Sequence, residues 1–180
     1  MKTFTKEEID RTRSYCVKQG MPELELKLAG REFSYFVMPA SLNTDLPNYV
    51  NRATGVQSDG YCFGVDERMP ERLRPYALLE EYIEFIELGM EKENRVIDSE
   101  NEVISLIIDE TLRQEYVLMR RDFFRNLLIQ NEKRPELYLF TDDDVVEFKK
   151  NLSMLEEKAQ SYEGGKLRWD KNNLMISNIL

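Results

Sequence analysis

The segment from Ala77 to Met90 restricts the fold of this chain more than any other part of its sequence. Apolar side chains recur along it at helical spacing, and glutamates at positions 80, 84, 87 and 91 form a second stripe, one helical turn apart. No lysine or arginine interrupts that stripe, so its like charges destabilise an isolated helix by several tenths of a kcal/mol per pair. Either the stripe faces water, or the fold supplies a cation, basic side chains or a basic partner.

Capping signals predict helices on both sides of this segment. Thr5 and Glu8 form a capping box that opens a helix ending near Gln19, with Gly20 as its stop. Proline is tolerated in a first turn, so Pro70 or Pro75 opens the glutamate helix, which continues to Glu91. Further helices are predicted from a second capping box at Ser99–Glu102, over 113–130, and from the aspartates 142–144 to about Tyr162, with Pro135 as a break before the last.

Strand signals lie mainly near the start of the chain. Residues 23–28 alternate between charged residues and leucine, and after the turn Ala29-Gly30 an aromatic segment returns over 32–38. This pattern is typical of a β-hairpin with one face in water. Residues 61–65 predict a short buried strand, 137–140 another, and 166–177 a second hairpin. The polar stretch 39–59 lacks periodicity, and irregular segments of this length are more often functional or disordered than idle.

These elements predict an α+β fold. A chain of 180 residues fits a single domain, here 1–180, and 42% hydrophobic residues supply a real core. We expect a small antiparallel sheet packed against three to four helices. Trp169 and the aromatic strand around Phe33 are expected in the core.

The absence of histidine removes several kinds of chemistry. Ser-His-Asp and Cys-His arrangements need histidine as the base, and the chain has none. Cys16 and Cys62 are too few for a disulfide framework and are expected to be reduced, buried thiols. Gly164-Gly165 lacks the spacing of a phosphate-binding loop, and the aspartates 142–144 lack the glycine and glutamate of a calcium loop. We expect no cofactor.

The net charge of −9 is concentrated in the middle of the chain. Residues 61–120 carry 15 acidic and 7 basic side chains, whereas the other two thirds are nearly balanced. Such a surface repels a phosphate backbone, so nucleic-acid binding is not expected. No run of about 18 apolar residues predicts a membrane span, and the first residues lack the apolar stretch of a signal peptide. The cytoplasm is the expected location.

The glutamate helix also resembles a known catalytic element. Leu79-Glu80-Glu81-Tyr82-Ile83-Glu84 is similar to a degenerate form of the zincin metallopeptidase helix, whose pattern is His-Glu-x-x-His. The resemblance places Glu81 at the general base and Glu80 and Glu84 at the two ligand positions, with both histidines missing. It implies a zincin-like scaffold that is an inactive relic, or one whose carboxylates would suit Mg²⁺, Ca²⁺ or Mn²⁺ rather than zinc.

Two functions follow as hypotheses. The first is a non-catalytic binding or regulatory protein that engages a basic protein surface, because Glu80–Glu115 holds 12 acidic and 3 basic residues. The second is a divalent-metal carboxylate hydrolase or relic, with a site built from Glu80, Glu81 and Glu84 and with Asp59 or Asp66 as further ligands. A third, a mimic of DNA, would need carboxylates spaced like phosphates. The candidate acidic site comprises Glu80, Glu81, Glu84 and Glu87.

A basic cluster follows the acidic segments. Arg120, Arg121 and Arg125 lie close together, the last two one turn apart. They are expected to pair with the glutamate stripe inside the fold, which would offset the repulsion between its like charges. The alternative is that Arg121 and Arg125 contact an anion or a protein partner.

Overall fold

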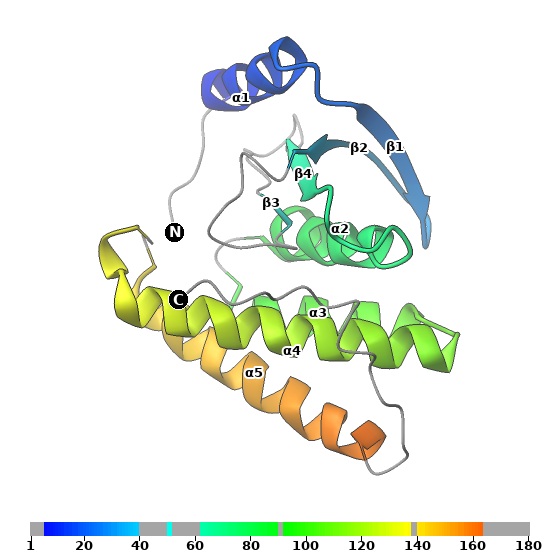
Figure 1. Ribbon diagram of the computed structural model, residues 1–180, viewed down its shortest axis with the longest axis vertical. Helices are drawn as coiled ribbons and strands as arrows, with labels where there is room; N and C mark the ends of the chain where they lie inside the picture. Colours follow the sequence, from blue (N-terminus) through cyan, green and yellow to red (C-terminus); the bar gives the residue numbers. More distant parts are fainter. Residues whose placement is uncertain (1–5, 40–49, 52–61, 90–91, 138–139, 164–180) are drawn as a thin grey trace.

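A small sheet and a layer of helices make up the fold (Figure 1). The computed structural model describes residues 6–39, 50–51, 62–89, 92–137 and 140–163. Helix α1 (Lys6–Lys18) lies on one side of the sheet, and the remaining α-helices lie on the other. The predicted α+β class is confirmed, with five α-helices in the described part of the chain instead of three or four.

The N-terminal hairpin forms as predicted. Strand β1 (Glu23–Leu28) pairs antiparallel with β2 (Arg31–Met38), with Leu26 opposite Phe33. Ala29 and Gly30 have φ values of 50° and 80°, the two successive positive values that a tight hairpin turn of this hand requires. Leu26 and Leu28 pack against the main core, while the intervening charged residues are exposed.

The sheet is mixed, not antiparallel as expected. Its strand order is β1-β2-β4-β3, and β4 (Phe63–Asp66) runs parallel to β2. The two-residue strand β3 (Val50–Asn51) pairs antiparallel with β4 and lies within the stretch predicted to be irregular. A parallel neighbour is possible because the chain between β2 and β4 is long enough for a crossover. Strand β4 is buried throughout, as predicted for residues 61–65.

The glutamate helix forms in two parts. Helix α2 (Arg74–Tyr82) has Pro75 in its first turn and continues as a π-helical segment, η3 (Ile83–Leu88). Gly89, with φ of 78°, follows it as the cap, and its amide donates to the Glu84 carbonyl at 3.1 Å, five residues back. The predicted helix is therefore present, but its hydrogen-bond register widens after Tyr82.

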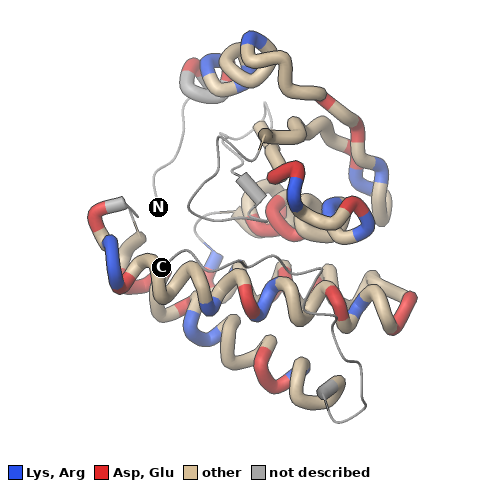
Figure 2. The backbone as a smooth tube through the Cα atoms, in the orientation of Figure 1, with Lys and Arg blue, Asp and Glu red and all other residues tan. Residues whose placement is uncertain are grey.

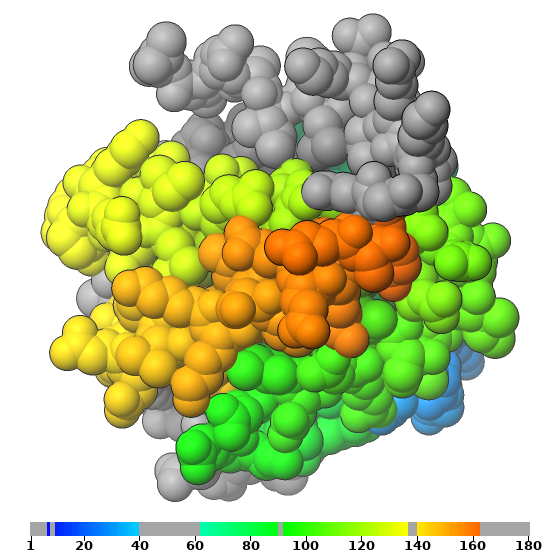
Figure 3. All heavy atoms as spheres, turned by 90° about the horizontal axis from the view of Figure 1, so that it is seen from below, coloured from blue at the N-terminus to red at the C-terminus, as the bar shows by residue number. Residues whose placement is uncertain are grey.

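Three long helices complete the layer. Helix α3 (Arg95–Leu106) begins four residues before the predicted start, so Ser99 lies inside the helix instead of capping it. Asp109 caps α4 (Glu110–Lys133), which ends before the short 3-10 helix η4 (Pro135–Leu137). Helix α5 (Asp142–Glu163) begins at the aspartates, as predicted. Figure 3 shows α5 lying across α4 and α3.

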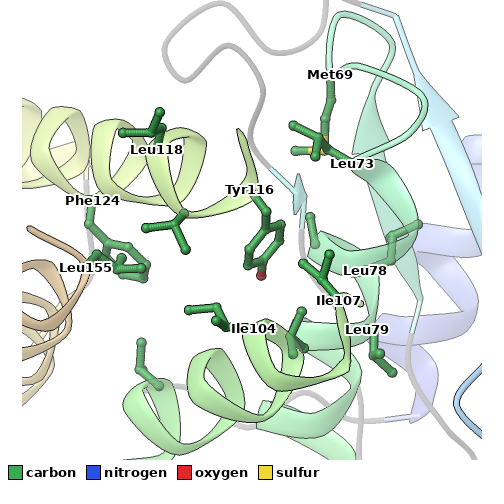
Figure 4. Packing of buried hydrophobic residues seen from close by; sticks show 14 of the residues in the cluster. Met69, Leu73, Leu78, Leu79, Ile104, Ile107, Tyr116, Leu118, Phe124 and Leu155 are labelled. Atoms are coloured by element: carbon green, nitrogen blue, oxygen red, sulfur yellow. The ribbon is translucent and has the colours of Figure 1, made fainter. Parts of the chain in front are cut away.

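The core lies between the sheet and the helices. Tyr116 of α4 reaches between apolar side chains of α2 and α3 (Figure 4). Phe33 of β2 stacks on Tyr82 of α2, with ring centroids 4.7 Å apart, which joins the hairpin to the helical layer. Among the helices of the described residues, none is both long and apolar enough to cross a membrane.

Some predictions fall wholly or partly outside the described residues. Thr5, Trp169 and the second hairpin over 166–177 lie there, as does most of 39–59. A strand was expected over 137–140. Its two described residues are not in a strand: Leu137 belongs to η4, and Phe140 belongs to no regular element.

Candidate functional site

The glutamate stripe is mostly inside the protein. Glu80 is fully buried, and Glu81 and Glu84 expose only 8% and 6% of their surfaces. Of the stripe's described members, Glu87 alone is exposed. The interpretation of the stripe as a solvated or partner-facing surface is therefore wrong for Glu80, Glu81 and Glu84. Arginines from other helices offset the repulsion between these buried glutamates.

Arg120 of α4 joins two of the buried carboxylates. Its Nη2 donates to Glu80 Oε2 and its Nε to Glu100 Oε2, both at 2.7 Å. The Ser99 hydroxyl donates to the other Glu80 oxygen at 2.9 Å, and Asn151 of α5 approaches Glu100 Oε2 at 3.4 Å. Four helices thus contribute to one cluster, which we call the Arg120 cluster.

Aromatic rings enclose the Arg120 guanidinium. Its Cζ atom lies 5.2 Å from the Phe123 centroid and 5.0 Å from that of Phe124. Arg120 exposes 4% of its surface, so these rings and the carboxylates replace its water. The sequence contained a signal for this placement. Tyr116 lies four residues before Arg120, and Phe123 and Phe124 lie three and four residues after it, so the Arg120 side chain is on the apolar face of the helix.

The Arg120 cluster contains two carboxyl groups but only one guanidinium. Burial raises the pKa of Glu80 well above its ordinary value, although Arg120 opposes the shift. Burial would lower the pKa of Arg120, but Glu100 and Glu80 outweigh it and hold that pKa well above its ordinary value. Two carboxyl groups share one guanidinium, and burial disfavours the charged form of Glu80.

A second cluster surrounds Arg95 at the start of α3. Its Nε donates to Glu84 Oε1 at 3.0 Å, and its Nη2 and Nη1 lie 3.5 Å from Asp144 and 3.7 Å from Glu147. Glu147 of α5 also accepts from the Val96 amide at 3.0 Å, so a carboxylate from another helix caps α3. Burial, reinforced by the charge of Glu81, raises the pKa of Glu84 to about 8 although Arg95 opposes it.

Glu87 forms its ion pair at the surface, outside the two buried clusters. Its two oxygens accept from Arg31 at 2.8 and 2.7 Å, and Arg31 also reaches Glu102 of α3 at 2.6 Å. This ion pair lowers the pKa of Glu87. The wide π-helical turn after Glu84 rotates Glu87 away from the line through Glu80 and Glu84, which explains why the stripe divides.

The other predicted basic residues have partners outside the stripe. Arg121 pairs with its neighbour Asp122 at 2.9 Å, and Arg125 pairs with Glu156 of α5 at 2.7 Å. The prediction that arginines of this segment neutralise the stripe is confirmed for Arg120 alone. The alternative role of Arg121 and Arg125, contact with an anion or a protein partner, stays a prediction.

The carboxylates of the metal hypothesis are engaged elsewhere. Both oxygens of Glu80 accept hydrogen bonds from protein groups, and both oxygens of Asp66 accept from Arg68 at 2.6 to 2.9 Å. Within the described part of the chain, no group of three or more His, Cys, Asp or Glu residues is arranged to hold a metal ion. Asp59 lies outside that part.

Comparisons with models of protein families, with curated proteins and with solved structures found no match for this chain. The class of the protein is therefore defined by its own architecture. It is an α+β protein whose helical layer is joined by buried carboxylate–arginine clusters.

Proposed function

We propose that this chain is a non-catalytic binding protein that engages a basic protein surface at the corner where α3 meets α4. The observation that carries the proposal is the exposure of Ile108, which is 94% open to solvent and is followed by the exposed Asp109 and Glu110. Ile107, its neighbour, is fully buried. The chain therefore presents one apolar side chain in an acidic setting at a fixed point of the fold.

Contacts on both sides of Ile108 hold the corner in place. Asp109 Oδ1 accepts from the Leu112 amide at 2.7 Å and so caps α4, while Ile107 is buried in the core. Figure 2 shows acidic residues where α3 turns into α4. A preorganised apolar anchor loses little entropy on binding, and the surrounding charges favour fast encounter with a basic surface.

The buried glutamates support a structural role and not a chemical one. At the two positions that resemble zincin ligands, Glu80 and Glu84 each bind an arginine. A descent from a zincin-like scaffold remains a hypothesis, in which Arg120 and Arg95 would have taken the place of the metal charge. The same proposal includes a cytoplasmic location, since two free buried thiols fit a reducing compartment.

The proposal is tested by capture experiments with matched variants. The full chain is immobilised as wild type, as Ile108→Ser/Glu110→Gln, and as the control Val146→Ser/Asp143→Asn. The control changes a half-exposed apolar residue and an exposed acid on α5. Proteins retained from a lysate of the source cells at rising salt are quantified by mass spectrometry.

We expect basic proteins that bind the wild type and the control equally and lose roughly tenfold in retention on the corner variant. Their retention should also fall with salt, because rim charges are screened. Equal retention by all three forms would refute the corner as the binding surface. Retained proteins that are not basic would refute the partner class.

A further inference from the structure

Both cysteines lie in a small core of their own. Cys16 of α1 and Cys62, just before β4, are buried with Met21 and Phe36 in a cluster separate from the main core. Helix α1 lies on the side of the sheet away from the other helices (Figure 1). Because Cys16 belongs to α1 and Phe36 to β2, the cluster joins this N-terminal helix to the sheet.

The two thiols belong to the same four-residue cluster and interact with each other, the Cys62 thiol donating a hydrogen bond to the Cys16 sulfur. They come from separate elements, so a disulfide between them would join α1 directly to the residue that precedes β4.

Cys16 is a buried contact of helix α1: among the α1 side chains that the structure describes, it alone is buried. Arg13 of α1 also pairs with Glu23 of β1, but both side chains are partly exposed, so this ion pair contributes little. The position of α1 is therefore sensitive to the chemical state of Cys16.

We propose that Cys16 and Cys62 form a redox-controlled cross-link, in which a low-molecular-weight disulfide such as glutathione disulfide oxidises the pair and locks α1 onto the sheet. The Cys16 thiolate attacks one sulfur of glutathione disulfide, forming a mixed disulfide and releasing one glutathione thiolate. The Cys62 thiolate, after losing its proton to water, attacks Cys16 Sγ and releases the second glutathione. The protein loses two protons and two electrons, and one glutathione disulfide becomes two glutathiones.

The order of attack follows from the surroundings of each sulfur. Burial raises the pKa of both thiols, that of Cys62 to about 12. The hydrogen bond from Cys62 partly offsets the shift at Cys16, so Cys16 ionises first. Both thiols are covered, so the exchange proceeds during brief outward movement of α1 and is slow in the closed state.

The experiment uses the full chain in glutathione buffers that range from fully reduced to fully oxidised. After acid quenching and alkylation, peptide mapping should find Cys16 linked to Cys62 in the native protein. Amide hydrogen exchange within α1 should then be about tenfold slower in the oxidised form, whereas α4 should not change. A cross-link that forms only in denaturant, or α1 exchange that is the same in both forms, would overturn the proposal.

Single variants test the order of attack. Cys62→Ala lacks the second thiol and should accumulate glutathione on Cys16, while Cys16→Ala should leave Cys62 largely unmodified. Circular dichroism confirms that each variant is folded. The opposite pattern, with glutathione on Cys62 alone, would show that the assigned order is wrong, and native mixed disulfides on both residues of the wild type would exclude the cross-link.

Discussion

Replacing Arg120 tests whether the Arg120 cluster stabilises the fold through its charge. Arg120→Met keeps most of the side-chain volume but leaves Glu100 and Glu80 buried without their shared cation. Removing one partner from a buried ion pair typically destabilises a protein by about 3–5 kcal/mol. Since whole domains are stable by about 5–15 kcal/mol, the loss should be large but measurable by urea unfolding at neutral pH.

The pH dependence of this loss distinguishes charge from packing. In Arg120→Met, Glu80 loses the cation that opposes the upward shift of its pKa, so its folded-state pKa lies still further above the unfolded value. A carboxyl with a raised folded pKa favours the native state below its unfolded pKa and loses that advantage as pH rises. The deficit relative to wild type should therefore be smaller at pH 4.5 than at pH 7.

A matched control separates the buried ion pair from arginine loss in general. Arg125→Met removes another arginine of α4, five residues after Arg120. Arg125 and its partner Glu156 are both partly exposed. Exposed ion pairs contribute about 0–1 kcal/mol, so this variant should stay near wild type. A deficit for Arg120→Met as small as that of Arg125→Met, or one that is the same at both pH values, would refute the electrostatic argument.

Three further predictions concern the carboxyl groups. Glu80→Gln should change the free energy of unfolding by less than about 1 kcal/mol at pH 7, because glutamine resembles the protonated acid that the cluster favours; a loss near that of Arg120→Met in urea titrations would contradict this. The pKa of Glu84 in the folded protein is about 8, so Glu84 stabilises the folded state fully below its ordinary pKa and progressively less as pH rises toward 8. The free energy of unfolding of the wild type should therefore fall between pH 5 and 8. Glu84→Gln should flatten that slope in melting curves, and an unchanged slope would exclude Glu84 as its source. Millimolar Mg²⁺, Ca²⁺ or Mn²⁺ should leave the melting temperature unchanged, since Arg120 and Arg95 already bind Glu80 and Glu84; a rise that Glu80→Gln/Glu84→Gln abolishes would restore the metal-site hypothesis.

Local patterns sufficed for most individual elements of the fold. The alternation over 23–28 and the turn Ala29-Gly30 predicted the hairpin, because the period and the turn chemistry are both contained within a few residues. The parallel pairing of β2 with β4 was missed. It depends on the path of the chain between them, and no local pattern specifies where a strand returns to a sheet.

The glutamates of the candidate site were grouped by helical periodicity, but their environment was misread. Periodicity showed that Glu80 and Glu84 share a helix face, yet it could not show that α3, α4 and α5 cover that face. A run of charges usually marks a solvated face, and here the covering helices bring arginines with them. The position of Arg120 among aromatic neighbours was the local sign that at least one arginine points inward.

This pairing changes what the acidic charge of the chain means for recognition. Of the 12 acidic residues between Glu80 and Glu115, Glu80, Glu84 and Glu100 are buried beside arginines. Several others are held by basic side chains at the surface, as Glu87 and Glu102 are by Arg31. The field available to a partner is therefore local and weaker than the net charge of −9 indicates. Attraction of that strength speeds encounter but gives little affinity, so a specific complex needs an apolar anchor as well, and the exposed Ile108 supplies one beside Asp109 and Glu110.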